Sequence, residues 1–164
     1  MSAGAYLLAH FSDPNKLIPA VEALGRLEPV TRWHAVDGHM HLVIKAGAAD
    51  RSLYEELRKI DGIDQLVRYQ IVQDGENTLI LDPALAHAYV FVETEPTETD
   101  NVHAKLEAMP EILFCSSTSG GCDLVAVVKG ANLDAVDRTV LERVRVLDGV
   151  VRVKHDRIIT LTQL

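Results

Sequence analysis

Three histidines, His34, His39 and His41, flank the dipeptide Asp37-Gly38 and are the first residues whose types suggest chemistry. Asp-Gly favours a two-residue hairpin turn, in which both turn positions take a positive φ. Such a turn would place His34 opposite His41 and put all three imidazoles on one sheet face. Imidazoles at that spacing can share a metal ion or a haem, and they titrate near neutral pH. The alternative is a polar hairpin end, since no carboxylate completes an obvious ligand set.

Other sequence features exclude several chemistries. The chain has no nucleophile elbow, Walker loop or dinucleotide fingerprint. Its two cysteines, Cys115 and Cys122, are too few for a disulfide scaffold or a four-ligand zinc site, which favours buried free thiols.

The charge of the chain bears on its partners. With 24 acidic and 16 basic residues the formal net charge is −8, and no three basic residues cluster, which disfavours direct nucleic-acid binding. No apolar run approaches the ~20 residues of a membrane span, and the first residues lack the pattern of a signal peptide. We therefore expect a cytoplasmic protein without membrane contact.

Hydrophobic periodicity predicts the order strand, helix, strand, strand, helix, strand in each half of the chain. In the first half Asp13 and Pro14 begin a helix to about Leu27, and Asp50 caps a second one. The predicted strands are residues 5–11, 30–36, 40–46, 65–72, 88–94, 112–116 and 122–128, with one or two more in 150–160. Residues 78–81 are a candidate extra strand.

Residue matches between the halves indicate a duplication. Ala5-Tyr6 recurs as Ala88-Tyr89, and Asp61-Gly62-Ile63 recurs as Asp148-Gly149-Val150. We predict an α+β protein of two tandem ferredoxin-like βαββαβ units, each an antiparallel sheet with both helices on one face. The domains would be 1–72 and 87–164, joined by a linker at 73–86. Strand residues facing away from the helices, such as Tyr6 and Tyr89, are too apolar for solvent and should be covered.

Several motifs of the second half resemble one family. They are Pro110-Glu111-Ile112, Ser119-Gly120-Gly121-Cys122-Asp123-Leu124, Leu147-Asp148-Gly149-Val150 and Arg152. In this order they resemble the effector-binding domain of the Lrp/AsnC family, the RAM domain, which is similar in fold to ACT domains. The resemblance covers about Ala88 to Leu164. The first half resembles a diverged copy, because its hairpin segment 37–42 has histidine in place of the acidic positions.

The resemblance implies a binding site for small effectors, such as amino acids, near the second hairpin. Carried over by position, it involves Ser119, Gly120, Gly121 and Asp123, with hydroxyls of Ser117 and Thr118 nearby. Glycines let a carboxylate approach backbone N–H groups, and Asp123 could accept from an ammonium group. The alternative is that residues 117–121 are only a long hairpin loop.

The resemblance therefore favours a non-enzymatic, self-associating module that senses a small molecule. Members of the family carry a DNA-binding domain, which we expect this chain to lack, so a DNA-binding regulator of the same family is a candidate partner. The alternative is a metal- or haem-dependent enzyme or cofactor binder, like dimeric α/β-barrel proteins, using His34, His39 and His41. A purely structural partner of full-length family members is a third candidate.

Overall fold

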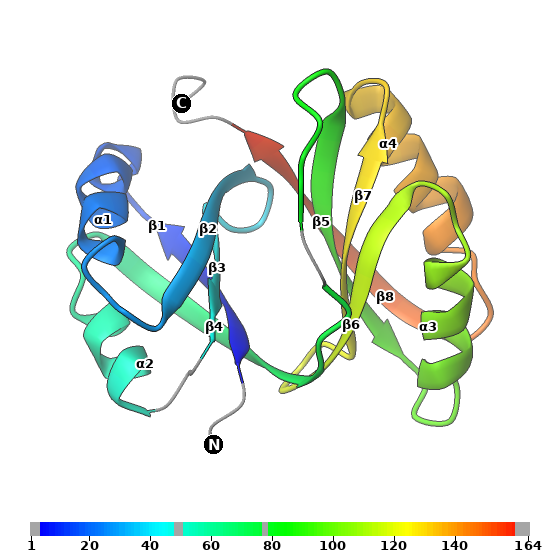
Figure 1. The fold of residues 1–164 in the computed structure, drawn as a ribbon, viewed down its shortest axis with the longest axis horizontal. Helices are drawn as coiled ribbons and strands as arrows, with labels where there is room; N and C mark the ends of the chain where they lie inside the picture. Colours follow the sequence, from blue (N-terminus) through cyan, green and yellow to red (C-terminus); the bar gives the residue numbers. More distant parts are fainter. Residues whose placement is uncertain (1–3, 48–50, 77–78, 160–164) are drawn as a thin grey trace. The chain divides into compact units, whose positions relative to one another are not determined.

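The chain forms two compact units, each with the element order βαββαβ (Figure 1). The computed structural model describes residues 4–47, 51–76 and 79–159, and within these ranges no helix is long and apolar enough to span a membrane. One unit runs up to Ile71 and includes Ile159, and the other comprises Val72–Ile158. The predicted α+β fold of two tandem ferredoxin-like units is confirmed, while the division into 1–72, 73–86 and 87–164 stays a prediction.

The first unit has an antiparallel sheet in the order β4-β1-β3-β2, with both helices on one face (Figure 1). Its elements are β1 (Ala5–Phe11), the 3-10 turn η1 (Pro14–Lys16), α1 (Leu17–Leu24), β2 (Val30–Asp37), β3 (Leu42–Ala46), α2 (Arg51–Arg58) and β4 (Ile63–Gln73). As predicted, Asp13 caps the turn, since its Oδ1 accepts from Asn15 N at 3.0 Å. Helix α1 ends at Leu24, earlier than predicted, where Gly25 lowers helix propensity. The predicted cap Asp50 lies outside the described residues.

The second unit repeats this sheet as β8-β5-β7-β6, again with its helices on one face (Figure 1). Its elements are β5 (Ala86–Thr94), α3 (Thr99–Glu107), β6 (Ile112–Ser119), β7 (Leu124–Gly130), α4 (Leu133–Thr139), the π-helical turn η2 (Val140–Val144) and β8 (Val150–Ile159). Asn132 Oδ1 caps α4 by accepting from Ala135 N at 2.8 Å. Residues 79–81 are not a strand, which corrects that prediction, and Thr78 is outside the described residues.

Period-two alternation gives each first strand two buried faces. Leu7 and Ala9 pack with the helices of their unit, and Val90 and Val92 do the same in theirs. On the opposite face, Tyr6, Leu8 and Tyr89 are fully buried and Phe91 is only 4% exposed. The prediction that this apolar face is covered is therefore confirmed.

Two equivalent glycines mark the repeat in the backbone. Gly62 and Gly149 follow the second helix of each unit and have φ values of +100° and +93°. Residues that carry a side chain rarely adopt this backbone conformation. A Cβ added at Gly149 would lie 2.5 Å from Glu98 Cβ, and one at Gly62 would clash with Lys16 Cβ. Both positions require glycine for the same two reasons.

We therefore expect Gly149→Ala to lower the free energy of unfolding by at least about 1–2 kcal/mol, because of left-handed strain and crowding. Gly25→Ala is the matched control: φ there is −62°, and the new Cβ would meet Glu22 O at an ordinary 3.5 Å. Urea unfolding followed by circular dichroism measures both. Equal stability of the two variants would contradict the expectation.

Candidate functional site

The β6–β7 hairpin of the second unit is tighter than predicted. Strand β6 continues to Ser119, and Ser117 pairs with Leu124 across the ladder. Thr118 N donates to Asp123 O at 2.8 Å, so residues 119–122 form the loop, with Gly120-Gly121 at its centre. Their φ values are +103° and +122°, a region in which glycine is the favoured residue. The loop of the hairpin therefore begins at Ser119 and not at Ser117.

The six predicted binding residues divide into two groups. The hydroxyls of Ser117 and Thr118 make contacts within the unit: half-buried Ser117 lies 3.1 Å from His103 Nδ1, and buried Thr118 donates to Cys122 O at 2.8 Å. The turn residues Ser119, Gly120 and Gly121 are exposed, and Asp123 is half-buried beside them. The residues able to touch a ligand are thus concentrated at the turn.

Asp123 connects the hairpin to the end of β5. Its Oδ2 accepts from Thr94 N at 2.8 Å and from Thr94 Oγ1 at 3.3 Å, and its own N–H donates to Val92 O at 2.9 Å. Thr94 Oγ1 is also 2.6 Å from Thr99 Oγ1, at the start of α3. One carboxylate oxygen therefore aligns a hairpin, a strand end and a helix start.

His41 does in the first unit what Asp123 does in the second. Its side-chain Nδ1 accepts from Phe11 N at 2.8 Å. Its backbone N–H donates to Ala9 O at 2.9 Å, and its backbone carbonyl accepts from Val36 N at 2.9 Å. These bonds match those of Asp123 with Thr94, Val92 and Thr118. The histidine replaces the aspartate as a hydrogen-bond acceptor for the end of the first strand.

The same bonds show that the predicted register of the first hairpin is wrong. His34 pairs with Val43 and Ala35 with Leu42, so His34 does not face His41. The turn lies at Gly38-His39, and neither residue has a positive φ. The physical reason is that His41 is bonded to β1, and these bonds outweigh the local preference of Asp37-Gly38.

The predicted metal or haem ligands are consequently not brought together. The ring next to His41 is that of His10, with centroids 4.6 Å apart, and His10 Nδ1 lies 2.7 Å from Asp64 Oδ1. Over residues 4–47, 51–76 and 79–159, no three His, Cys, Asp or Glu side chains form a group that could hold a metal ion. The combination of His34, His39 and His41 has no support from this geometry.

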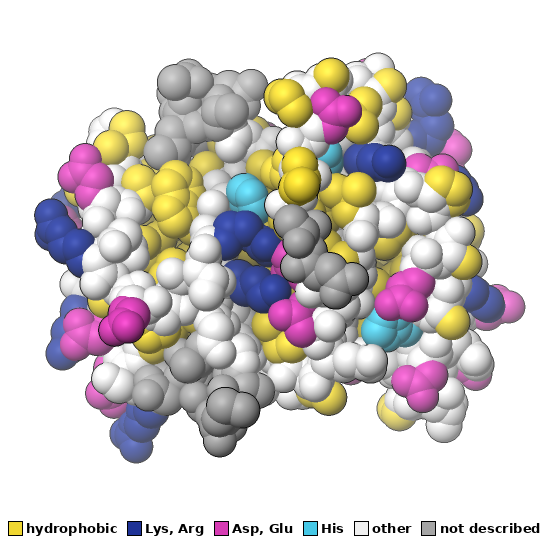
Figure 2. Space-filling model, viewed as in Figure 1, with side chains coloured by type: hydrophobic (Ala, Val, Ile, Leu, Met, Phe, Trp, Pro, Cys, Tyr) yellow, Lys and Arg dark blue, Asp and Glu magenta, His cyan; other side chains and the backbone are white. Residues whose placement is uncertain are grey.

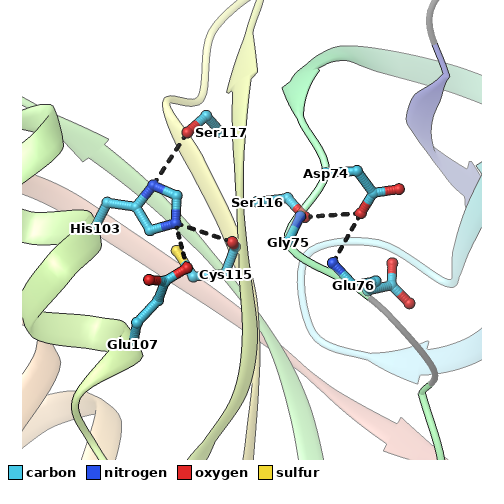
Figure 3. Close-up of polar contacts among 8 residues, drawn as sticks. All are labelled: Asp74, Gly75, Glu76, His103, Glu107, Cys115, Ser116 and Ser117. Carbon is cyan, nitrogen blue, oxygen red and sulfur yellow. Dashed lines mark hydrogen bonds and ion pairs between the residues drawn. The ribbon is translucent and has the colours of Figure 1, made fainter.

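His103 on α3 is a site residue that sequence reasoning missed (Figure 3). Its Nε2 lies 2.9 Å from Glu107 Oε1 and 3.0 Å from Cys115 O, while its Nδ1 lies 3.1 Å from Ser117 Oγ. Because both groups at Nε2 only accept hydrogen bonds, Nε2 donates to them, while Nδ1 shares a hydrogen bond with the Ser117 hydroxyl. The i,i+4 spacing of His103 and Glu107 was the available signal.

Ser116 makes a second set of polar contacts, with Asp74 and Gly75 (Figure 3). Its Oγ accepts from Gly75 N at 2.9 Å and donates to Asp74 Oδ1 at 3.3 Å. A Cβ on Gly75 would clash with Cys115 O, so only glycine permits this approach to β6. Together with His103, these contacts hold the strand that leads into the hairpin, and we assign them a positioning role.

The surface charge agrees with the composition. On the face drawn in Figure 2, Asp and Glu side chains are dispersed, and Lys and Arg side chains occur in small groups.

Both cysteine side chains are buried, which suppresses their reactivity. Burial raises the pKa of the Cys115 thiol to about 12, and burial raises that of Cys122 to about 11 in spite of its hydrogen bonds. The thiolate is the reactive form, so burial keeps both thiols in the unreactive protonated form at pH 8.

We expect neither thiol to react with Ellman's reagent at pH 8 in the folded chain, and both to react rapidly in 8 M urea, where each thiol regains its ordinary pKa of about 8.5. Absorbance at 412 nm counts the modified thiols. Rapid modification of a thiol without denaturant would contradict its burial.

The acceptor role of His41 also has a direct test. We expect His41→Ala to destabilise the chain by about 1–3 kcal/mol, because the N–H of buried Phe11 loses its partner. His41→Asn keeps a side-chain acceptor and should retain most of the stability. Thermal unfolding measures the stability of both variants. Equal losses of stability would show that the side-chain acceptor is not the cause of the destabilisation.

Comparisons with known proteins find a family match in the second unit. The model of the Lrp/AsnC ligand binding domain matches residues 87–159. No curated protein sequence matches the chain significantly.

Solved structures resemble the chain at low identity. FFRP-DM1 is 24% identical over 45% of this chain and 99% of its own, with a TM-score of 0.44. E. coli AsnC is 12% identical over 70% of this chain and 74% of its own, with a TM-score of 0.45. The siroheme decarboxylase NirDL is 10% identical over 95% of this chain and 71% of its own, with a TM-score of 0.73, a likeness of fold alone. The family match, together with the ferredoxin-like fold, shows that residues 87–159 of this chain belong to the Lrp/AsnC ligand-binding domain family.

Proposed function

We propose that this chain is a regulatory module that binds a small molecule, of the amino-acid class, at the Gly120-Gly121 turn. The observation that carries the proposal is that an exposed Gly-Gly turn, with positive φ at both residues, lies beside a half-buried carboxylate within the family domain. Such a turn exposes backbone N–H groups without side chains, so that a ligand carboxylate can approach them.

Asp123 would hold the ammonium group of the ligand. Within the part of the chain that the structure describes, its hydrogen bonds run through Oδ2 to Thr94, so Oδ1 is the oxygen that would accept from the ligand. The Ser119 hydroxyl would add a bond to the carboxylate. Ser117 and Thr118, whose hydroxyls face His103 and Cys122, would support the turn rather than touch the ligand.

The ligand signal would pass through other proteins. Because the chain is acidic, with a net charge of −8, we expect its effect on transcription to run through self-association or a DNA-binding regulator of the same family. Occupation of the turn would alter Asp123 and, through Thr94 and Thr99, the start of α3.

The proposal predicts that one or more amino acids raise the melting temperature and bind measurably in isothermal titration calorimetry. Asp123→Asn keeps an oxygen for Thr94 N but loses the charge, so affinity should fall by about tenfold or more while the fold remains. Glu142→Gln, an exposed residue of η2, is the control and should bind like the original chain.

Two results would overturn the proposal. One is that no amino acid stabilises the well-folded chain. The other is that Asp123→Asn binds as tightly as Glu142→Gln, which would place the ligand elsewhere.

A further inference from the structure

A cavity of about 370 Å³ lies at the hairpin end of the first unit, in the size range of small-molecule sites. Its walls are mainly apolar, with two polar side chains. The apolar residues are Phe11, Pro14, Leu17, Val36 and Ile159, and the polar ones are Asp37 and His41.

Ordered elements build this cavity. Phe11, Leu17 and Val36 are each at most 2% exposed, so they form the packed base of the cavity, and the surface open to a ligand is that of Pro14, Asp37, His41 and Ile159. The Asp13 cap holds Pro14 at the start of η1. The bond from Phe11 N to His41 Nδ1 holds the imidazole at the cavity wall. The space is therefore preformed, which lowers the cost of binding.

The equivalent positions of the second unit are polar. The shared hydrogen bonds align Phe11 with Thr94 and Val36 with Thr118, and the next residue aligns Asp37 with Ser119. The two units thus keep one backbone arrangement at this end of the sheet. The first has apolar walls and a carboxylate where the second has hydroxyls, so the two ends suit different ligands.

The charged groups at the cavity indicate which sign of charge a ligand should carry. Among the lining residues that the structure describes, Asp37 is the one acidic or basic residue besides His41, and it is exposed at the end of β2. Because His41 Nδ1 accepts a hydrogen bond, the imidazole is neutral in this arrangement. The field at the cavity therefore favours a cation and disfavours an anion.

We propose that this cavity is a second small-molecule site, which takes an apolar molecule bearing one ammonium group. The apolar body lies against Pro14 and Ile159, and the ammonium group pairs with Asp37. The site is separate from the Gly120-Gly121 turn and does not depend on the function proposed for it.

The test is a titration of the ¹⁵N-labelled chain with phenethylamine, followed by amide shifts, with 3-phenylpropionate as an anion of similar shape. Saturable shifts at Phe11, Leu17, Val36 and Asp37 with phenethylamine, and affinity at least about tenfold weaker for 3-phenylpropionate, are expected. The absence of saturable shifts at these residues, or equal affinity for both probes, would overturn the proposal.

Matched variants test whether the carboxylate of Asp37 is the group that pairs with the ammonium group of the ligand. Asp37→Asn should weaken phenethylamine binding by about tenfold, and Asp37→Glu should retain it. Glu55→Gln, on α2 of the same unit, should have no effect. Asp123→Asn should also leave phenethylamine binding unchanged, which separates this site from the proposed amino-acid site. Unaltered binding by Asp37→Asn, or a loss in Asp123→Asn, would contradict the assignment.

Discussion

The hydrogen bond that the last backbone N–H of the first strand donates to a hairpin side chain organises the hairpin end of the sheet in both units. In one unit Asp123 Oδ2 accepts from Thr94 N, and in the other His41 Nδ1 accepts from Phe11 N. The bond aligns the hairpin with the strand in both units, and in the second unit Thr94 also reaches Thr99 at the start of α3. A buried N–H without a partner costs stability, so the position tolerates aspartate or histidine because each supplies an acceptor.

This constraint explains how the two units diverged. The backbone bonds of the hairpin persist, while the side chains around them change from Thr94, Thr118 and Ser119 to Phe11, Val36 and Asp37. Gly120-Gly121 gives one hairpin an exposed turn with two positive φ values, and the other hairpin adjoins an apolar cavity. A duplicated scaffold can therefore carry two different ligand sites, as we propose.

Local patterns in the sequence were sufficient to predict the fold. Strand β1 runs over Ala5–Phe11 as its apolar run predicts, and the helical stripe from Leu133 continues through Val144. The register of the first hairpin was not predictable in this way, because bonds of His41 to β1 decide it rather than Asp37-Gly38. The role of His103 also depends on tertiary contact, since Ser117 and Cys115 reach it from β6.

The central claim is that the Gly120-Gly121 turn of the family domain binds the regulatory ligand. Hydrogen–deuterium exchange with and without a mixture of the protein amino acids tests it most directly. A ligand bound at this turn should slow exchange at the amides of residues 119–123, where it would hold the N–H groups, and at the start of α3. Unchanged exchange across this hairpin, together with protection elsewhere in the chain, would contradict it.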